Sequence, residues 1–269
     1  MSHASPSLRV HRSVLAVAVA ALVFVGCHPS SHDAGSHWGY SGSHGPENWG
    51  TAGGENCLCA EGTEQSPIDI RAADLTSATL ESLSFDYSGS TVVEVFNNGH
   101  TIQADVAPGG GVLRIGDDAY RLLQFHFHTP SEHRVEGESF AAEMHLVHVS
   151  ETGTLAVVGI LMRAGAPMEG LARVWADLPD SIEAPARRLA EFDLRPLVPE
   201  NKRSYRYAGS LTTPPCSEGV RWHVMAQSDT MSAWQLDAFT AMFGPPVPAI
   251  GNSRPVQPLH GRVIRTDVD

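Results

Sequence analysis

The sequence of 269 residues lacks a hydrophobic run long enough to cross a membrane, and it is short of basic residues. Its longest apolar stretch, residues 14–26, has about two-thirds of the length that a membrane-spanning helix needs. Lys and Arg number 18 against 30 Asp and Glu, which gives a formal net charge of −12. Because an acidic chain repels polyanions, nucleic acid and direct docking on anionic lipid are excluded as partners. Internal repeats are absent too, so a repeat architecture is excluded.

The short apolar stretch at the start of the chain predicts export. It follows the basic residues Arg9 and Arg12, as in a secretory signal, and it ends in Phe24-Val25-Gly26-Cys27. Apolar and small residues before a cysteine resemble a bacterial lipoprotein signal, in which Cys27 is lipidated and becomes the new N-terminus. The alternative is an ordinary cleaved signal. We therefore expect a signal peptide at 1–26, a flexible linker at 27–36, one domain at 37–269, and a lipid-anchored protein in the periplasm or cell envelope.

Cysteines are few, and their number agrees with export. If Cys27 carries lipid, Cys57, Cys59 and Cys216 remain, and three thiols cannot all pair. A bridge between Cys57 and Cys59 would close a very tight ring. A long-range bridge to Cys216 is physically better and would restrict the unfolded chain. The residues alone leave its partner open.

From about Gln65 onward, the pattern of the chain is predominantly β. Asn98-Gly99 is a hairpin-turn signal between the predicted strands Thr91–Phe96 and Thr101–Val106. Further strands are predicted at Val112–Ile115, Tyr120–His128, Phe140–Val149, Leu155–Met162, Arg203–Ala208 and Gly219–Ala226, and short helices at Met168–Leu178 and Ser232–Phe243. The aromatic, glycine-rich segment 38–49 shows no period and predicts irregular structure packed on the domain. The predicted fold is a β-dominated mixed α/β domain around a large, mostly antiparallel, twisted central sheet with short peripheral helices.

Histidines at a two-residue spacing predict a metal site. His126 and His128 lie on a predicted strand, so their side chains point to the same face of the sheet. His145 on the next predicted strand can converge with them, and three neutral imidazoles with one open position make a catalytic zinc site. The alternative for each histidine is a satisfied core residue.

Two neighbours of these histidines are placed to hold the imidazoles. Gln124 shares strand parity with His126, and Glu143 shares it with His145. A metal-ligating imidazole needs an acceptor for its other ring nitrogen, which these side chains can supply. A core amide satisfied by the backbone is the alternative for Gln124, whereas a carboxylate facing inward on an apolar strand is costly without a partner.

Eight ordered motifs resemble those of the α-class carbonic anhydrases. They are His37-Trp38-Gly39-Tyr40, Gln65-Ser66-Pro67-Ile68-Asp69-Ile70, Asn98-Gly99-His100, Gln124-Phe125-His126-Phe127-His128, Ser131-Glu132-His133, Ala142-Glu143-Met144-His145-Leu146-Val147-His148, Ser210-Leu211-Thr212-Thr213-Pro214-Pro215 and Asn252-Ser253-Arg254-Pro255. The motifs run in family order over the whole predicted domain.

The resemblance implies a role for each matching residue. The implied zinc ligands are His126, His128 and His145, and the implied proton shuttle is His100. Thr212 is implied to accept a hydrogen bond from zinc-bound hydroxide and to donate to Glu132. Residues implied to hold the ligands from behind are Gln124, Glu143 and the backbone of Asn252. The implied apolar wall beside the metal consists of Val147, Val157, Leu211 and Trp222, and Thr213 is implied to help bind bicarbonate.

The activity implied is the reversible hydration of carbon dioxide to bicarbonate and a proton by attack of zinc-bound hydroxide. Two other functions are weighed against it. A catalytically silent binding protein on the same fold is disfavoured, because no zinc histidine is missing here. Ester hydrolysis would be a side reaction of the same hydroxide. The predicted partner is a small molecule, the predicted membrane contact is the lipid on Cys27, and a homodimer is left open.

The departures from the animal members resemble the bacterial branch. Only Thr129-Pro130-Ser131 separates His128 from Glu132, and the turn at 150–154 is also short, which predicts an open mouth of the site. Cys59 and Cys216 match the disulfide of that branch, which would brace the loop that carries Thr212. Cys57 has no counterpart in the family.

Overall fold

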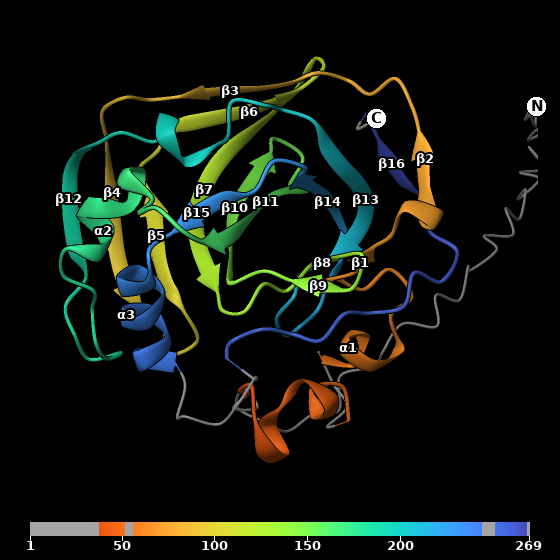
Figure 1. Cartoon of the computed structure of the whole chain (residues 1–269), viewed down its shortest axis with the longest axis horizontal. Helices are drawn as coiled ribbons and strands as arrows, with labels where there is room; N and C mark the ends of the chain where they lie inside the picture. Colours follow the sequence, from red (N-terminus) through yellow and green to blue (C-terminus); the bar gives the residue numbers. More distant parts are fainter. Residues whose placement is uncertain (1–37, 52–55, 244–250, 268–269) are drawn as a thin grey trace, which may run out of the picture.

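A large twisted sheet forms the body of the molecule in the computed structural model, which describes residues 38–51, 56–243 and 251–267 (Figure 1). The main sheet has 13 strands and a second, small sheet has three. The predicted signal peptide and linker, with Cys27, lie outside the described residues. Within the described residues, no helix combines the length and the apolar character needed to span a bilayer.

The strands are β1 (Asp69–Ile70), β2 (Leu75–Ser77), β3 (Leu83–Tyr87), β4 (Thr91–Asn97), β5 (Ile102–Val106), β6 (Gly111–Ile115), β7 (Asp118–His128), β8 (Arg134–Val135), β9 (Glu138–Ser139), β10 (Ala142–Ser150), β11 (Leu155–Ala164), β12 (Arg187–Phe192), β13 (Ser204–Ser210), β14 (Glu218–Met225), β15 (Asp229–Met231) and β16 (Ile264–Thr266). The helices are α1 (Leu58–Glu61), α2 (Ala172–Trp175) and α3 (Ala233–Phe243), with 3₁₀ turns η1 (Gly42–His44), η2 (Pro46–Asn48), η4 (Ala72–Asp74), η5 (Glu169–Leu171) and η6 (Arg195–Leu197). Segment 38–49 is irregular apart from η1 and η2, as predicted.

The main sheet runs in the order β12-β4-β5-β7-β10-β11-β14-β13-β16-β2, with β15 beside β11, and with β6 between β7 and β3. Most neighbouring strands are antiparallel, whereas β11 with β14, β11 with β15 and β16 with β2 are parallel. A short turn joins β10 to β11, where Gly153 adopts a φ of +86° that favours glycine.

The large, mostly antiparallel sheet with few short helices confirms the predicted fold class.

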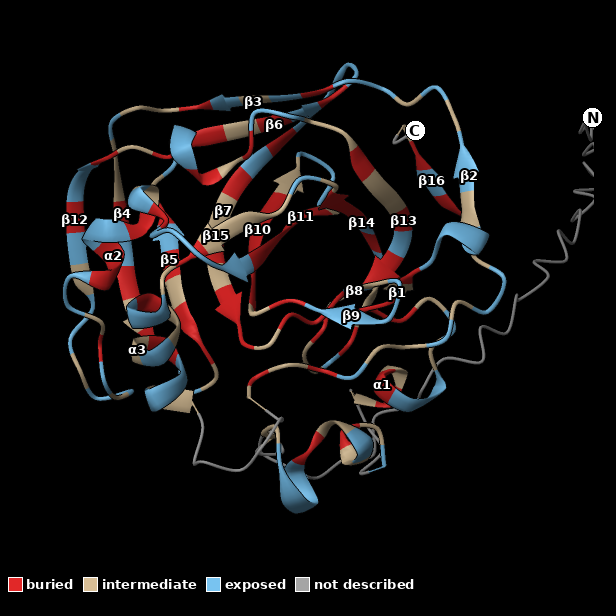
Figure 2. Ribbon diagram, in the orientation of Figure 1, coloured by how far each residue is buried: buried red, intermediate tan, exposed pale blue. Residues whose placement is uncertain are grey.

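The centre of the sheet is covered on both faces, so its strands are buried almost throughout (Figure 2). On β10, Met144 and Leu146 belong to the larger core, which α2 and α3 cover, while Val147 belongs to a second core on the opposite face. This alternation follows from the period of two along a strand. Because His145 lies between Met144 and Leu146, its side chain points to the face of the second core.

The helix predicted at Met168–Leu178 is shorter in the structure and is divided between η5 and α2. The Arg187 guanidinium donates to the carbonyl oxygens of Val174, in the last turn of α2, and of Asp177, just after it. Strands β3 and β12 were not predicted. Strand β12 is largely polar or charged and its alternation is weak, whereas β3 alternates between apolar and polar residues but is only five residues long.

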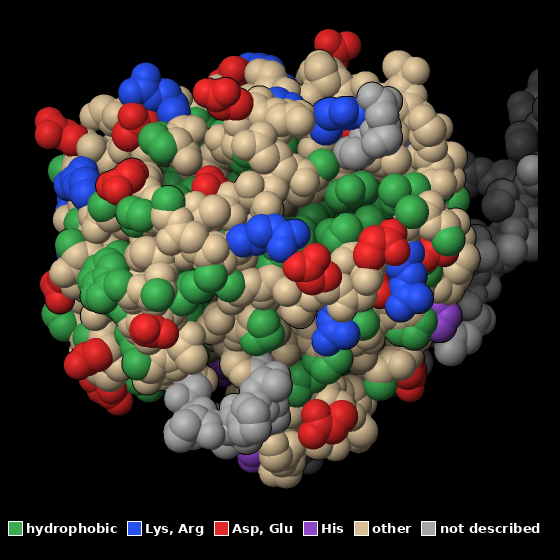
Figure 3. Space-filling model, viewed as in Figure 1, with side chains coloured by type: hydrophobic (Ala, Val, Ile, Leu, Met, Phe, Trp, Pro, Cys, Tyr) green, Lys and Arg blue, Asp and Glu red, His purple; other side chains and the backbone are tan. Residues whose placement is uncertain are grey.

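The surface carries charges of both signs. Figure 3 shows that acidic and basic side chains are interspersed on the face viewed, rather than gathered by sign. The described residues of that face therefore carry no single-sign patch for electrostatic docking.

Candidate metal centre

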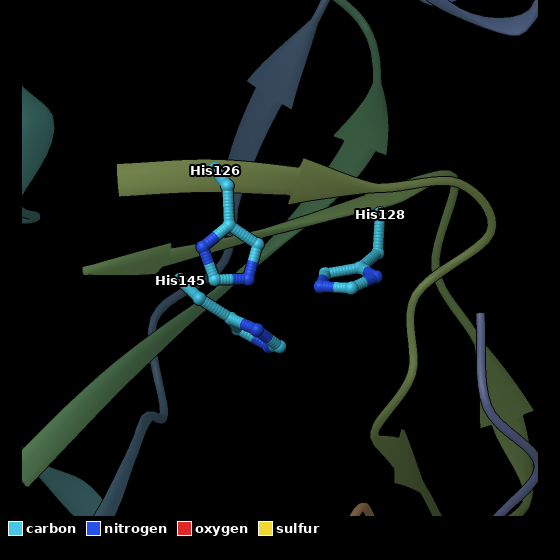
Figure 4. A group of neighbouring side chains, drawn as sticks. All are labelled: His126, His128 and His145. Atoms are coloured by element: carbon cyan, nitrogen blue, oxygen red, sulfur yellow. The ribbon is translucent and has the colours of Figure 1, made fainter. Parts of the chain in front are cut away.

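Three histidine side chains converge from two neighbouring strands. His126 and His128 extend from β7 and His145 extends from β10, where it pairs directly with His126 (Figure 4). One ring nitrogen of each lies within 4.8 Å of one ring nitrogen of the others. The prediction from the spacing is thus met by the geometry: the three imidazoles face one common space and could hold a metal ion.

The other ring nitrogen of each imidazole faces an oxygen acceptor. The nitrogen–oxygen pairs are His126 Nδ1 with Gln124 Oε1 (2.9 Å), His128 Nδ1 with the backbone oxygen of Asn252 (2.8 Å), and His145 Nε2 with Glu143 Oε1 (2.9 Å). These nitrogens donate, because the oxygens can only accept. Each ring therefore turns a lone pair toward the common space.

The protonation states also suit a metal. Burial lowers the pKa of all three imidazoles, to about 4 for His128 and well below the usual value for His126, where the other two histidines lower it further. The rings are therefore neutral at pH 7, as metal ligation requires. Among the described residues, His128 Nε2 is a buried atom without a hydrogen-bond partner. Three nitrogen donors with an orphaned lone pair fit a zinc ion, which takes imidazole nitrogens readily.

Glu143 is fully buried, yet its carboxylate is satisfied on both oxygens. Oε1 accepts from His145 and from His133 Nδ1 at 2.7 Å, and Oε2 accepts from the backbone N–H groups of Glu132 and His133. Burial alone would raise the pKa of Glu143, but the histidine charges and hydrogen bonds hold it well below its usual value. The cluster of His133, Glu143 and His145 is thus a hydrogen-bonded unit rather than a second metal site.

A second buried carboxylate, Glu132, connects the metal centre to the loop that carries Thr212. Its Oε1 accepts from the backbone N–H of Arg254 at 2.8 Å. Burial raises the pKa of Glu132 to about 7, against the lowering effects of His145, of the Arg254 N–H and of a hydrogen bond from the Thr212 side chain. Glu132 Oε2 has no other hydrogen-bond partner among the described residues, so in its ionised form the carboxylate can accept the proton of the Thr212 hydroxyl.

The comparisons with known proteins agree with this site. A family model described as eukaryotic-type carbonic anhydrase matches residues 44–268. The chain belongs to the α-carbonic anhydrase family. A carbonic anhydrase of Neisseria gonorrhoeae is 40% identical over 236 residues, which span 87% of this chain and 90% of that one. One of Klebsiella pneumoniae is 42% identical over 231 residues, which span 85% and 90%.

Solved α-carbonic anhydrases share the whole fold. The enzyme of Thermovibrio ammonificans, in complex with the inhibitor sulfanilamide, has a TM-score of 0.80 at 43% identity over 86% of this chain and 100% of that one. The enzyme of Photobacterium profundum has a TM-score of 0.76 at 40% identity over 85% and 100%. Both similarities cover the sheet that carries the three histidines.

The apolar residues that the carbonic anhydrase resemblance singled out lie together beside the metal centre. Val147, Val157 and Trp222 belong to the second core, and Leu211 packs against it. The Trp222 ring lies 4.9 Å from the His145 ring, centroid to centroid. The hydroxyl-bearing Thr213 is half-buried on the same loop as Thr212.

His100 lies on the turn between β4 and β5, away from the three ligands in sequence. Its ring stacks on Trp38, with centroids 3.6 Å apart and an interplanar angle of 8°. Its backbone N–H donates to Asn98 Oδ1 at 2.9 Å. The irregular aromatic segment of this carbonic anhydrase thus contacts the implied proton shuttle directly.

The disulfide between Cys59 and Cys216 is confirmed, with Cα atoms 5.0 Å apart and a sequence separation of 157. It joins α1 to the end of the loop that carries Thr212. Cys57 is buried, and no cysteine among the described residues is free.

Sequence reasoning missed the group that supports Glu143 from behind. His133 Nε2 lies 2.6 Å from the Tyr207 hydroxyl, which donates to Ser66 Oγ at 2.9 Å. Gly209 is required beside it, because an added Cβ would lie 2.2 Å from Ser66 Oγ. His133 and Ser66 belong to the family motifs, but the motifs did not indicate what these two residues do. Tyr207 belongs to none of the motifs.

Proposed function

We propose that His126, His128 and His145 bind a zinc ion at which this chain reversibly hydrates carbon dioxide to bicarbonate and a proton. Family membership and the carbonic anhydrases among its relatives support the activity. The observation that carries the assignment is the convergence of three neutral imidazoles, each with its other nitrogen donating to an acceptor. Bound there, zinc would lower the pKa of a coordinated water to about 7 and so supply the nucleophile.

Thr212 and Glu132 orient that nucleophile in the proposal. With its proton donated to the ionised Glu132, Thr212 Oγ1 would only accept from a group at the open metal position. An oxygen that donates to Thr212 turns its lone pair away from Thr212 and toward the substrate. The same arrangement disfavours metal ligands that have no hydrogen to donate to Thr212 Oγ1.

The apolar wall receives carbon dioxide, which has no net dipole and gains nothing from polar partners. Val147, Val157 and Trp222 are buried and exclude water from this side of the centre. Thr213, whose side chain is half-buried beside them, offers a hydroxyl to bicarbonate. The charged bicarbonate would thus contact the Thr213 hydroxyl, and the uncharged carbon dioxide would contact apolar side chains.

His100 carries the proton away from the metal centre in this proposal. An imidazole ordinarily has a pKa near 6.5, so a histidine side chain can take up and release protons at neutral pH. The stacked position on Trp38 places the ring in contact with the aromatic segment 38–49 and outside the group of ligands. From there it can pass the proton to buffer.

The activity is tested with the purified protein in a stopped-flow carbon dioxide hydration assay. Hydration well above the buffer rate is expected, with loss on treatment with dipicolinate and recovery on addition of zinc. His145→Ala should abolish it. His260→Asn is the matched control, because His260 is exposed and its φ of +50° suits asparagine. Zinc-loaded protein that hydrates no faster than buffer would refute the proposal.

Export with a lipid on Cys27 is part of the proposal, together with a signal at 1–26 and a linker at 27–36. The Cys59–Cys216 disulfide supports an oxidising compartment. A lipidated Cys27 is a thioether, whereas a simply cleaved signal leaves no lipid on the chain. The intact mass of the mature protein from cells decides between these alternatives, since acylation adds a mass that simple cleavage does not.

A further inference from the structure

One buried amide side chain connects the metal-binding strand to the turn of His100. Asn252 is 1% exposed, and its backbone oxygen accepts from His128 Nδ1. Its Nδ2 donates to two carbonyl oxygens, that of His100 at 3.0 Å and that of Phe127 at 2.8 Å. Its Oδ1 accepts from the Thr129 N–H at 2.8 Å. Both polar atoms of this side chain therefore have hydrogen-bond partners. The two N–H groups of Nδ2 connect the backbone of His100 to the backbone of strand β7 at Phe127.

A carboxamide suits this position better than any other side chain. Two donors and one acceptor are needed in one plane, which excludes Asp and Ser, and Gln is longer by a methylene. The preceding residue brings the amide close. Gly251 has a φ of +48°, and an added Cβ would lie 1.6 Å from the Thr129 oxygen. The loop thus approaches the end of β7 more closely than a residue with a side chain allows.

The turn of His100 is tied to the same peptide by a second side chain. Thr101 Oγ1 donates to the Phe127 oxygen at 2.6 Å and accepts from the Phe127 N–H at 3.2 Å. Asn98 Oδ1 accepts from the N–H groups of both His100 and Thr101. Since Phe127 stands between His126 and His128, the turn and the ligands share one rigid support.

We propose that the side chain of Asn252, with Thr101, is a positioning group for proton transfer, which sets the separation between the His100 imidazole and the metal centre. The inference rests on the proposed role of His100 as the shuttle. Proton transfer between the two sites depends steeply on their separation, because bridging waters must remain aligned. Stacking on Trp38 holds only the ring of His100, whereas Asn252 and Thr101 hold its backbone against the ligand strand.

The test compares Asn252→Asp and Thr101→Val with the unmodified zinc-loaded protein. Asn252→Asp keeps the shape and the backbone acceptor of His128 but removes both donors. Thr101→Val removes both hydrogen bonds between the Thr101 hydroxyl and Phe127. In dilute non-imidazole buffer, kcat should fall about five- to tenfold for each. The ratio kcat/KM and the zinc content should stay within about twofold, because carbon dioxide conversion at the metal does not need His100. Added imidazole should restore kcat.

Two controls and three outcomes complete the test. Thr101→Ser keeps the hydroxyl and should retain kcat. Ser253→Ala, on the same loop, loses only a bond to the Pro130 oxygen and should behave like the unmodified protein. If kcat is unchanged in both test variants but falls in His100→Ala, the positioning role is wrong and the shuttle role of His100 stands. Parallel losses of kcat/KM or zinc in both would overturn it in favour of a merely structural role. An unaffected His100→Ala would instead refute the shuttle on which the inference depends.

Discussion

At the scale of single residues, several side chains at this site use two polar atoms for two different partners. Glu143 serves His145 with one oxygen and the backbone of Glu132 and His133 with the other. In the proposed function, Thr212 gives its proton to Glu132 and so keeps only an acceptor for the open metal position. A conservative substitution that removes one atom should therefore change orientation while the fold remains.

Removal of the Thr212 hydroxyl is expected to slow the reaction at the metal itself. Thr212→Val keeps the shape but loses the acceptor, and kcat/KM should fall by about 100-fold, the scale of one lost transition-state contact. Thr212→Ser keeps the hydroxyl and should stay within about tenfold of the unmodified protein. Stopped-flow hydration at equal zinc content measures both. Equal activity of the Val and Ser variants would contradict the role.

His100→Ala should lower kcat and leave kcat/KM largely intact, because only proton export is lost. The loss should be about tenfold in dilute buffer. Imidazole in the buffer should restore it by carrying the proton instead. Turnover measured against imidazole concentration checks both halves of the expectation. A variant with neither loss nor rescue would show that another group exports the proton.

At the scale of elements, the loop between β13 and β14 is braced from outside the sheet. It carries Thr212, and the disulfide joins it to α1 at Cys59. The Gln65 side chain donates to the Cys216 oxygen at 3.0 Å, and Arg254 donates to the Cys59 oxygen at 2.9 Å. The same Arg254 gives its backbone N–H to Glu132. Both ends of the Thr212–Glu132 interaction thus depend on one brace.

The double variant Cys59→Ser/Cys216→Ser should unfold more easily. The bridge closes a long loop, so its loss should lower the free energy of unfolding by about 2–5 kcal/mol. Urea titration without reductant measures this, and the unmodified protein titrated with reductant should approach the variant. We also expect a smaller loss of kcat/KM than in Thr212→Val, since the loop is loosened but keeps its hydroxyl. An unchanged unfolding midpoint would show that the brace contributes no stability.

At the scale of the whole molecule, two histidines are buried away from the metal centre. His148 Nε2 lies 2.6 Å from the Tyr87 hydroxyl, and burial lowers the pKa of His148 to about 4. His223 has no hydrogen-bond partner on either ring nitrogen among the described residues. Burial lowers its pKa to about 3, with help from the positive charges of Arg206 and Arg221. Both rings are therefore neutral in the folded protein.

These two histidines should make the protein less stable in mild acid, an effect partly offset by Glu132, whose pKa burial raises. In the unfolded chain these histidines protonate near pH 6.5, but in the fold they do not until about pH 4 and 3. The unfolded state therefore binds more protons below about pH 6.5. The free energy of unfolding should fall by up to about 1.4 kcal/mol per pH unit for each histidine, until the pKa of the folded state is reached.

His223→Leu is the matched variant for this expectation. It removes a buried polar ring that has no hydrogen-bond partner among the described residues, so it should stabilise the protein at pH 7 and flatten the decline between pH 6 and 4. Urea titrations of the zinc-loaded protein and the variant over this pH range measure the difference, in which the titration of other groups cancels. Parallel pH curves would refute the assignment to His223.

The metal ligands were predictable from the sequence because they follow from a local period. A two-residue spacing puts His126 and His128 on one face of any strand, and the same parity associates Gln124 with His126 and Glu143 with His145. The Cys59–Cys216 pairing was not local, and only the order of family motifs indicated it. Strand β12 escaped prediction because its alternation is weak.

By itself, the sequence determined the sheet, the three histidines and the family, since periodicity and ordered motifs are properties of the chain alone. Only the tertiary structure decided which distant groups meet. Asn252 reaches the His100 carbonyl across 152 positions, and Arg254 reaches Glu132 across 122. No local pattern encodes such contacts, because they depend on how closely one loop packs against the end of a strand. At Gly251 that approach depends on the absence of a single Cβ atom.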